Sequence, residues 1–105
     1  MSSIAIQSID LIENQITVLF DKIWFQENIT TLRTLLLSDI SSLNIKEVVI
    51  GADLESVRFQ WLDTEFILNF DYYSQSCWFE AQDPHSLAET LTLFTLLTQN
   101  NEHYV

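Results

Sequence analysis

Residues 56–70 read SVRFQWLDTEFILNF, and this stretch decides the fold class of the chain. Its large apolar residues fall at alternate positions on either side of a polar interruption: Val57, Phe59, Trp61, then Phe66, Leu68 and Phe70. A period of two places these side chains on one face of a β-strand, with Arg58 and Gln60 on the other face. The stretch therefore predicts two antiparallel strands with one buried face, joined by a tight turn at Asp63-Thr64.

Four more segments carry strand patterns. Residues 45–50 (IKEVVI) precede the central pair and end at Gly51, and residues 76–81 (SCWFEA) follow it. Near the N-terminus, Ile4 to Leu11 alternate with one break in phase, which is typical of a β-bulge. A turn at Asn14-Gln15 would lead into residues 16–20 (ITVLF). We expect an antiparallel meander from residue 45 to residue 81, with a hairpin before it.

Two helices complete the pattern. The first is predicted from Ile29 to Leu43 with Asn28 as its N-cap, because one narrow stripe at 3.6 residues per turn is apolar: Ile29, Leu32, Leu36, Ile40 and Leu43. The second is predicted to begin with Asp83 as N-cap and Pro84 at the first helical position. Its expected inner stripe is Leu87, Leu91, Phe94 and Thr98, and residues 100–105 are expected to fray.

These elements predict one α+β domain over residues 1–105. A one-faced antiparallel sheet needs a cover, and helices with apolar stripes need a surface to pack on. We therefore expect a two-layer sandwich in which two helices cover one face of a sheet of about five strands, in the order ββαβββα.

The charge balance excludes several function classes. Fifteen acidic residues against four basic ones give a formal net charge of −11. Phosphate backbones and anionic membranes repel such a surface, so we expect neither nucleic-acid nor membrane binding. The sequence shows no signal peptide and no apolar run long enough to span a bilayer. We expect a soluble cytoplasmic protein of bacterial type.

The residues that could carry chemistry are few. Cys77 is the only cysteine, and His85 lies eight residues after it, so the two raise the question of a nucleophile and its general base. Cys77 falls in the middle of a predicted strand, however, where a thiol packs as a small apolar group. No pair of His or Cys has metal-ligand spacing, and one glycine cannot build a phosphate loop. We expect no catalytic residue, no metal and no cofactor, and hence no enzyme.

The remaining candidate for function is an apolar surface that binds another protein. The second helix and the solvent side of the sheet carry more apolar side chains than a minimal core needs, and these form the candidate interaction surface: Leu62, Ile67, Tyr73, Trp78, Leu93, Leu96 and Leu97. Exposed, they would mark an interface. Alternatively, the sheet is covered more fully and these residues belong to the core.

The predicted function follows from charge and surface together. We expect a non-catalytic protein–protein interaction module, adaptor- or chaperone-like, with a protein partner or a second copy of itself. The layout of helices and antiparallel sheet resembles that of small acidic bacterial secretion chaperones, although this chain begins with two strands instead of a helix. The alternative is an acidic inhibitor of a basic partner, such as an immunity protein, an antitoxin or a DNA mimic.

Overall fold

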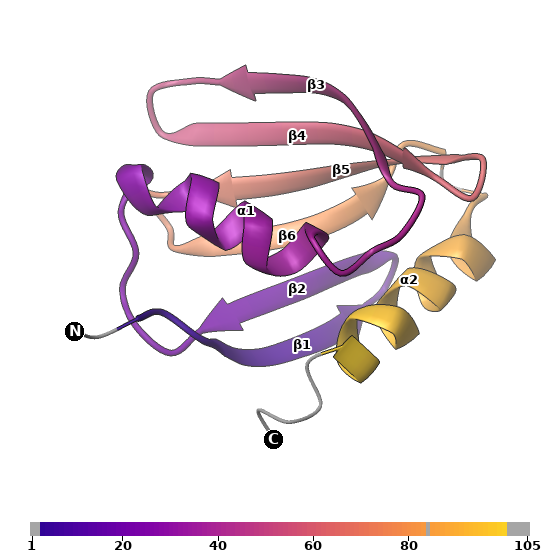
Figure 1. Ribbon diagram of the computed structural model, residues 1–105, viewed down its shortest axis with the longest axis horizontal. Coiled ribbons are helices and arrows are strands. Elements are labelled where there is room, and N and C mark those ends of the chain that lie inside the picture. Colours follow the sequence, from indigo (N-terminus) through magenta and orange to yellow (C-terminus); the bar gives the residue numbers. More distant parts are fainter. Residues whose placement is uncertain (1–2, 84, 101–105) are drawn as a thin grey trace.

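The computed structural model describes residues 3–83 and 85–100, which form one antiparallel sheet and two α-helices (Figure 1). The predicted α+β class is confirmed, but the sheet has six strands instead of about five, in the order ββαββββα. The predicted places of Pro84 and of the tail at residues 101–105 lie outside the described residues. The elements are β1 Ile6–Ile12, β2 Gln15–Phe20, the 3₁₀ turn η1 Gln26–Asn28, α1 Ile29–Leu37, β3 Asn44–Ile50, β4 Leu54–Trp61, β5 Thr64–Asp71, β6 Ser76–Ala81 and α2 Leu87–Asn100.

The strands lie in the spatial order β1-β2-β6-β5-β4-β3. Strands β3 to β6 form the predicted meander, and the β1–β2 hairpin joins it through antiparallel pairing of β2 with β6. The chain reaches β3 from β2 through α1, which crosses the sheet (Figure 1). As a result, β1 and β3 are the two edge strands, and β3 pairs only with β4.

The buried face of the sheet carries the residues that the alternation predicted. Val57 pairs with Leu68, and Leu68 pairs with Phe79 on the next strand, so that an apolar row crosses three strands. Phe59 stacks on Phe66 at a centroid distance of 5.6 Å, and Phe59 and Phe79 meet edge to face at a centroid distance of 6.1 Å. All of these side chains are fully buried, so this aromatic cluster is the centre of the core.

The central hairpin turns one residue earlier than predicted. Trp61 pairs with Thr64, so the two turn residues are Leu62 and Asp63, and both have positive φ, 52° and 63°. Two successive left-handed residues match the right-handed twist of the flanking strands. The strand register that pairs Phe59 with Phe66 sets the position of the turn, and it overrides the local preference of Asp63-Thr64 for a turn.

Helix α1 is shorter than predicted and is capped differently. The Asn28 carboxamide accepts a hydrogen bond from the Phe25 backbone N–H at 2.8 Å and makes no side-chain cap bond to α1. The helix ends at Leu37, because the Ser- and Asp-rich segment that follows competes for backbone hydrogen bonds. The predicted stripe is nevertheless packed inward: Ile29, Leu32, Leu36 and Ile40 are buried and Leu43 is half-buried.

Helix α2 packs on a different face from the predicted one. It begins at Leu87, and Asp83 accepts a hydrogen bond from the His85 backbone N–H instead of capping the helix. Its buried residues are Thr90, Leu93 and Leu97, whereas Leu87 and Leu91 are each 51% exposed. Thr90 tolerates burial because its hydroxyl donates to the Ser86 carbonyl at 2.9 Å, which leaves its methyl group for the core.

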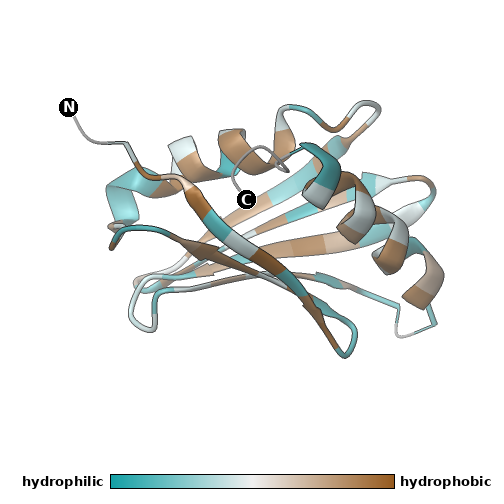
Figure 2. Cartoon of the chain, turned by 90° about the horizontal axis from the view of Figure 1, so that it is seen from below, coloured by the Kyte–Doolittle hydropathy of each residue, from teal (hydrophilic) through white to brown (hydrophobic). Residues whose placement is uncertain are grey.

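Both helices lie on the same side of the sheet, and no described segment lies over the other side (Figure 2). The core therefore fills the space between the sheet and the two helices. The opposite side, called the open face below, is lined mostly by half-buried and exposed side chains, with Asn69 buried among them. None of the described helices is long and apolar enough to span a membrane.

Candidate interaction surface

Cys77 lies on the buried face of β6 and is completely inaccessible. Burial raises the pKa of its thiol, so that the thiol stays protonated well beyond neutral pH. His85 is exposed in the segment that leads into α2. An inaccessible, protonated thiol packs as a small apolar residue.

The buried thiol predicts a pH effect on stability. Its folded pKa lies above the ordinary thiol value of 9.0, so above that pH the unfolded chain releases a proton that the folded chain keeps. The stability contributed by the neutral thiol is present below pH 9.0 and is lost as the pH rises. We expect the free energy of unfolding of the wild type to fall relative to Cys77→Ala by about 1.4 kcal/mol per pH unit.

Urea unfolding of both proteins, from neutral pH to strongly alkaline pH, measures this difference. The two proteins share all other titrating groups, so subtracting one curve from the other isolates the thiol. A difference that stays constant above pH 9.0 would mean that the folded protein already ionises Cys77.

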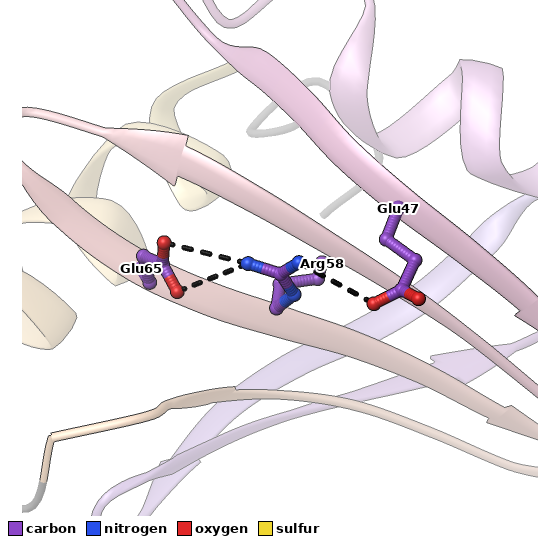
Figure 3. A network of polar contacts seen from close by, with 3 residues as sticks. All are labelled: Glu47, Arg58 and Glu65. Carbon is purple, nitrogen blue, oxygen red and sulfur yellow. Dashed lines mark hydrogen bonds and ion pairs between the residues drawn. The ribbon is translucent and has the colours of Figure 1, made fainter.

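The acidic side chains of the described residues do not assemble into a metal site. No group of three or more His, Cys, Asp or Glu side chains within residues 3–83 and 85–100 has the geometry to hold an ion. On the open face, Arg58 binds Glu65 of β5 and Glu47 of β3, each at 3.3 Å (Figure 3). On the buried side, Glu55 pairs with Arg33 of α1 at 3.5 Å. Part of the negative charge is thus neutralised within the fold.

A second polar chain crosses the open face. The Ser56 hydroxyl donates to Asn69, the Asn69 amide donates to Glu80, and Gln15 donates to the other oxygen of Glu80. Beside it, Trp78 lines a shallow hollow of about 430 Å³ between β2 and β6. Trp78 and Ile67 are half-buried among these polar groups, so the centre of the open face is a mixed surface and not a continuous apolar patch.

The predicted surface does not form one patch. Leu93 and Leu97 of α2 are fully buried, so for these two residues the surface placement was wrong and the alternative placement in the core is the one observed. Leu96 is half-buried and packs partly against the core. Leu93 and Leu97 are buried because α2 packs against the core with the face that carries Thr90, Leu93 and Leu97, and not with the face that carries Leu87 and Leu91. Of the remaining residues, Leu62 and Tyr73 are exposed, but they lie in the turns at opposite ends of β5.

Three loops are tied together at the Tyr73 end of the sheet. The Gln75 side chain accepts from the Trp24 backbone N–H and donates to the Trp24 and Tyr72 carbonyls, which joins the β5–β6 turn to the segment after β2. The Tyr72 backbone N–H donates to the Asp53 carbonyl in the β3–β4 turn at 2.9 Å. The Gln26 side chain donates to the Gly51 carbonyl in the same turn. These bonds connect segments that are far apart in the sequence.

Aromatic packing supports the same end. Trp24 is buried and meets Phe70 edge to face at 5.9 Å, while Phe25 packs against Tyr72 at 6.1 Å. Trp24 thereby anchors the crossover segment to the core, and its neighbours in sequence remain outside. The loops are a supported platform and not loose connections.

This platform presents large apolar side chains to solvent, and we call them the apolar loop end. They are Ile23 (70% exposed), Phe25 (50%), Leu54 (44%) and Tyr73 (83%). Exposed apolar residues that occur singly need no explanation, but here Ile23, Phe25 and Tyr73 come from loops that hydrogen bonds join, and Leu54 begins β4 directly after one of these loops. A surface of this kind is typical of a protein-binding site.

Exposed carboxylates border the apolar loop end. Asp21, Glu27 and Asp53 belong to the same loops, and all three are exposed. The backbone N–H of Ala5 donates to Asp21 at 2.8 Å and holds the pKa of this carboxyl below its ordinary value. Lys22 is the basic residue in these loops, and it already pairs with Asp21.

Sequence patterns found only one of the four residues of this surface. Tyr73 was among the predicted surface residues, whereas Ile23, Phe25 and Leu54 were not. The pattern of residues 21–25 (DKIWF) fits either the continuation of the preceding strand or a crossover to the helix. The signal that could have found Ile23 and Phe25 is that residues 23–25 are all apolar, although neither a strand with one buried face nor a solvent-exposed crossover requires three consecutive apolar residues.

Comparisons with known proteins give one finding. The model of a family described as a protein of unknown function, DUF3630, matches residues 5–99. No curated protein and no solved structure matches the chain significantly.

Proposed function

The chain belongs to the DUF3630 family, whose function is unknown, and from this premise we propose that the domain is a non-catalytic protein-interaction module. The observation that carries the proposal is the apolar loop end, where Ile23, Phe25 and Tyr73 on the loops and Leu54 at the start of β4 are exposed, and where hydrogen bonds hold the loops together. The burial of Cys77 supports the non-catalytic part, because the one thiol of the chain is inaccessible.

The partner that fits this surface is a protein segment with aromatic or aliphatic side chains flanked by Lys or Arg. Its apolar side chains would cover Phe25 and Tyr73, and its cations would face Glu27 and Asp53. A formal net charge of −11 favours the approach of such a segment and repels acidic ones. Charge at the rim of an apolar contact mainly speeds association, while the apolar centre supplies most of the affinity.

Selection from a random-peptide phage library tests the proposal. We expect the wild type to enrich peptides in which basic residues flank aromatic or aliphatic ones. Tyr73→Asp and Leu54→Asp should each weaken binding of the selected peptides about tenfold or more, because each removes apolar contact worth about 1.5–3 kcal/mol. Raising the salt concentration should weaken binding further by screening the rim charges.

Leu62→Asp is the matched control. Leu62 is also an exposed leucine in a hairpin turn of β4, but it lies at the opposite end of the strand from Leu54. We expect it to leave peptide binding unchanged. Selected peptides without basic residues, or equal losses for Leu54→Asp and Leu62→Asp, would overturn the assignment of this surface.

A further inference from the structure

Strand β3 differs from every other described strand because all seven of its residues are exposed. It lies at the outer edge of the sheet, beyond β4 (Figure 1). Helix α1 does not cover it, since a groove of about 310 Å³ separates the two, lined by Leu37, Ile40, Leu43 and Ile45. The end of β3 is apolar: Val48 is 39%, Val49 54% and Ile50 68% exposed.

The backbone of this segment has free hydrogen-bonding groups. Gly51 donates to the Leu54 carbonyl at 2.7 Å, so Gly51 and Leu54 form a hydrogen-bonded pair. Antiparallel ladders alternate hydrogen-bonded and non-bonded pairs, so Val49 bonds inward to β4 whereas Val48 and Ile50 direct their N–H and C=O groups outward. An added strand would find four backbone groups on these two residues.

The other half of β3 is protected against pairing. The register with β4 shifts between Ile45 and Glu47, which places a bulge at Lys46. Bulges and edge lysines both hinder the addition of a strand. Val48 to Ile50 have neither protection, so pairing along this edge is confined to three residues.

We infer that this edge binds a second copy of the chain through antiparallel pairing of β3 with β3, with Val49 on the two-fold axis. In this register Val48 forms a bonded pair with Ile50 of the second copy, and Ile50 with its Val48, which gives four backbone hydrogen bonds. Val49 faces Val49 on the open-face side. Every outward group of Val48 and Ile50 gains a partner, and the side chains that meet are all apolar.

Charge favours this register over a shifted one. Of the Lys and Arg side chains among the described residues, Lys46 is the one without an ion pair, and Arg58 holds the neighbouring Glu47 (Figure 3). With Val49 on the axis, the Lys46 end of β3 runs toward the β3–β4 turn of the second copy, which carries the exposed Asp53. The same edge is used by both copies, so the assembly closes as a dimer and leaves no β3 edge free.

A three-residue ladder is a small interface, in the size class of weak and transient complexes. We therefore expect a concentration-dependent dimer in sedimentation velocity, with a mass of twice 12.3 kDa at its upper limit. Two chains of charge −11 repel each other, so added salt should strengthen the dimer. Added salt should instead weaken the peptide binding proposed above. That proposal does not depend on the dimer.

Disulfide trapping tests the register. Cys77 is buried, so Val49→Cys would add the only accessible thiol of the described chain. Non-bonded antiparallel pairs bring Cα atoms to about 4.5 Å, within the range that a disulfide spans. Under oxidised glutathione we expect Val49→Cys to form a covalent dimer at least about tenfold faster than Thr95→Cys, an exposed control on α2, because pairing raises the local thiol concentration.

Val48→Cys distinguishes the registers, since Val48 would meet its own copy only if the axis passed through Val48. We expect it to cross-link more slowly than Val49→Cys. Faster cross-linking of Val48→Cys would overturn the proposed register. A wild type that stays monomeric at the highest soluble concentration, together with equal rates for Val49→Cys and Thr95→Cys, would overturn the dimer itself.

Discussion

Phe59→Ala is expected to lower the free energy of unfolding by about 3–5 kcal/mol, the largest loss from any single truncation considered for this chain. Phe59 is completely buried, stacks on Phe66 and meets Phe79 edge to face. Truncation removes the transfer free energy of the ring and leaves a cavity that three paired strands cannot collapse around. Domains of this size are stable by only about 5–15 kcal/mol, so much of the total is at stake.

Thermal and urea unfolding followed by circular dichroism measure this loss. For a domain of roughly this size, each kcal/mol corresponds to about 4–8 °C in Tm, so we expect a decrease of about 12–40 °C. Leu91→Ala is the control, because Leu91 is half exposed on α2 and alanine favours the helix. It should change stability by less than about 0.5 kcal/mol. Similar losses for the two variants would contradict the placement of the core.

The second large effect separates the two faces of α2. Leu93→Asp should abolish stable folding or cost at least about 4 kcal/mol, because it places a carboxylate without a partner in a fully buried site. Leu91→Asp, two residues earlier on the exposed side, should cost only about 0.5–1 kcal/mol, mainly through helix propensity.

The pair is informative because the residue type and the substitution are the same. Urea unfolding at neutral pH gives both free energies. Sequence periodicity alone predicts the opposite ranking, since it places Leu91 on the inner stripe. A larger loss for Leu91→Asp than for Leu93→Asp would therefore restore the periodicity-based face and return Leu93 to the surface.

The ambiguity of α2 has a physical origin. Two stripes at helical spacing overlap in its sequence, one through Leu87, Leu91 and Phe94 and the other through Thr90, Leu93 and Leu97. The first is apolar over its first three positions and reaches a threonine only at Thr98, whereas the second begins with Thr90. Once Thr90 satisfies its hydroxyl on the Ser86 carbonyl, its methyl packs as an apolar group and the second stripe becomes equivalent. Helix propensity and hydrophobic periodicity do not show whether the Thr90 hydroxyl will find this hydrogen-bond partner, so they do not predict which stripe is buried.

The candidate surface was predictable only in part for a related reason. In a strand, the alternation of apolar and polar residues predicts which face each side chain lies on. A crossover segment has no such period, so its sequence does not predict which side chains are exposed. The position of Phe25 depends on how the loops converge around Gln75 and Tyr72, through hydrogen bonds between segments that are distant in sequence. Tyr73 was predicted because the sequence pattern placed it on the solvent side of the sheet.

The sequence alone determined the class of the fold, the buried face of β4, β5 and β6, and the buried stripe of α1. These features depend on local rules: a period of two separates the faces of a strand, and a period of 3.6 aligns a stripe on a helix. Only the tertiary structure decided that β2 pairs with β6, which leaves β3 as an uncovered edge, and that α2 buries Leu93 instead of Leu91. Those choices depend on which distant surfaces fit together and which polar groups find partners, and neither quantity is contained in a local pattern.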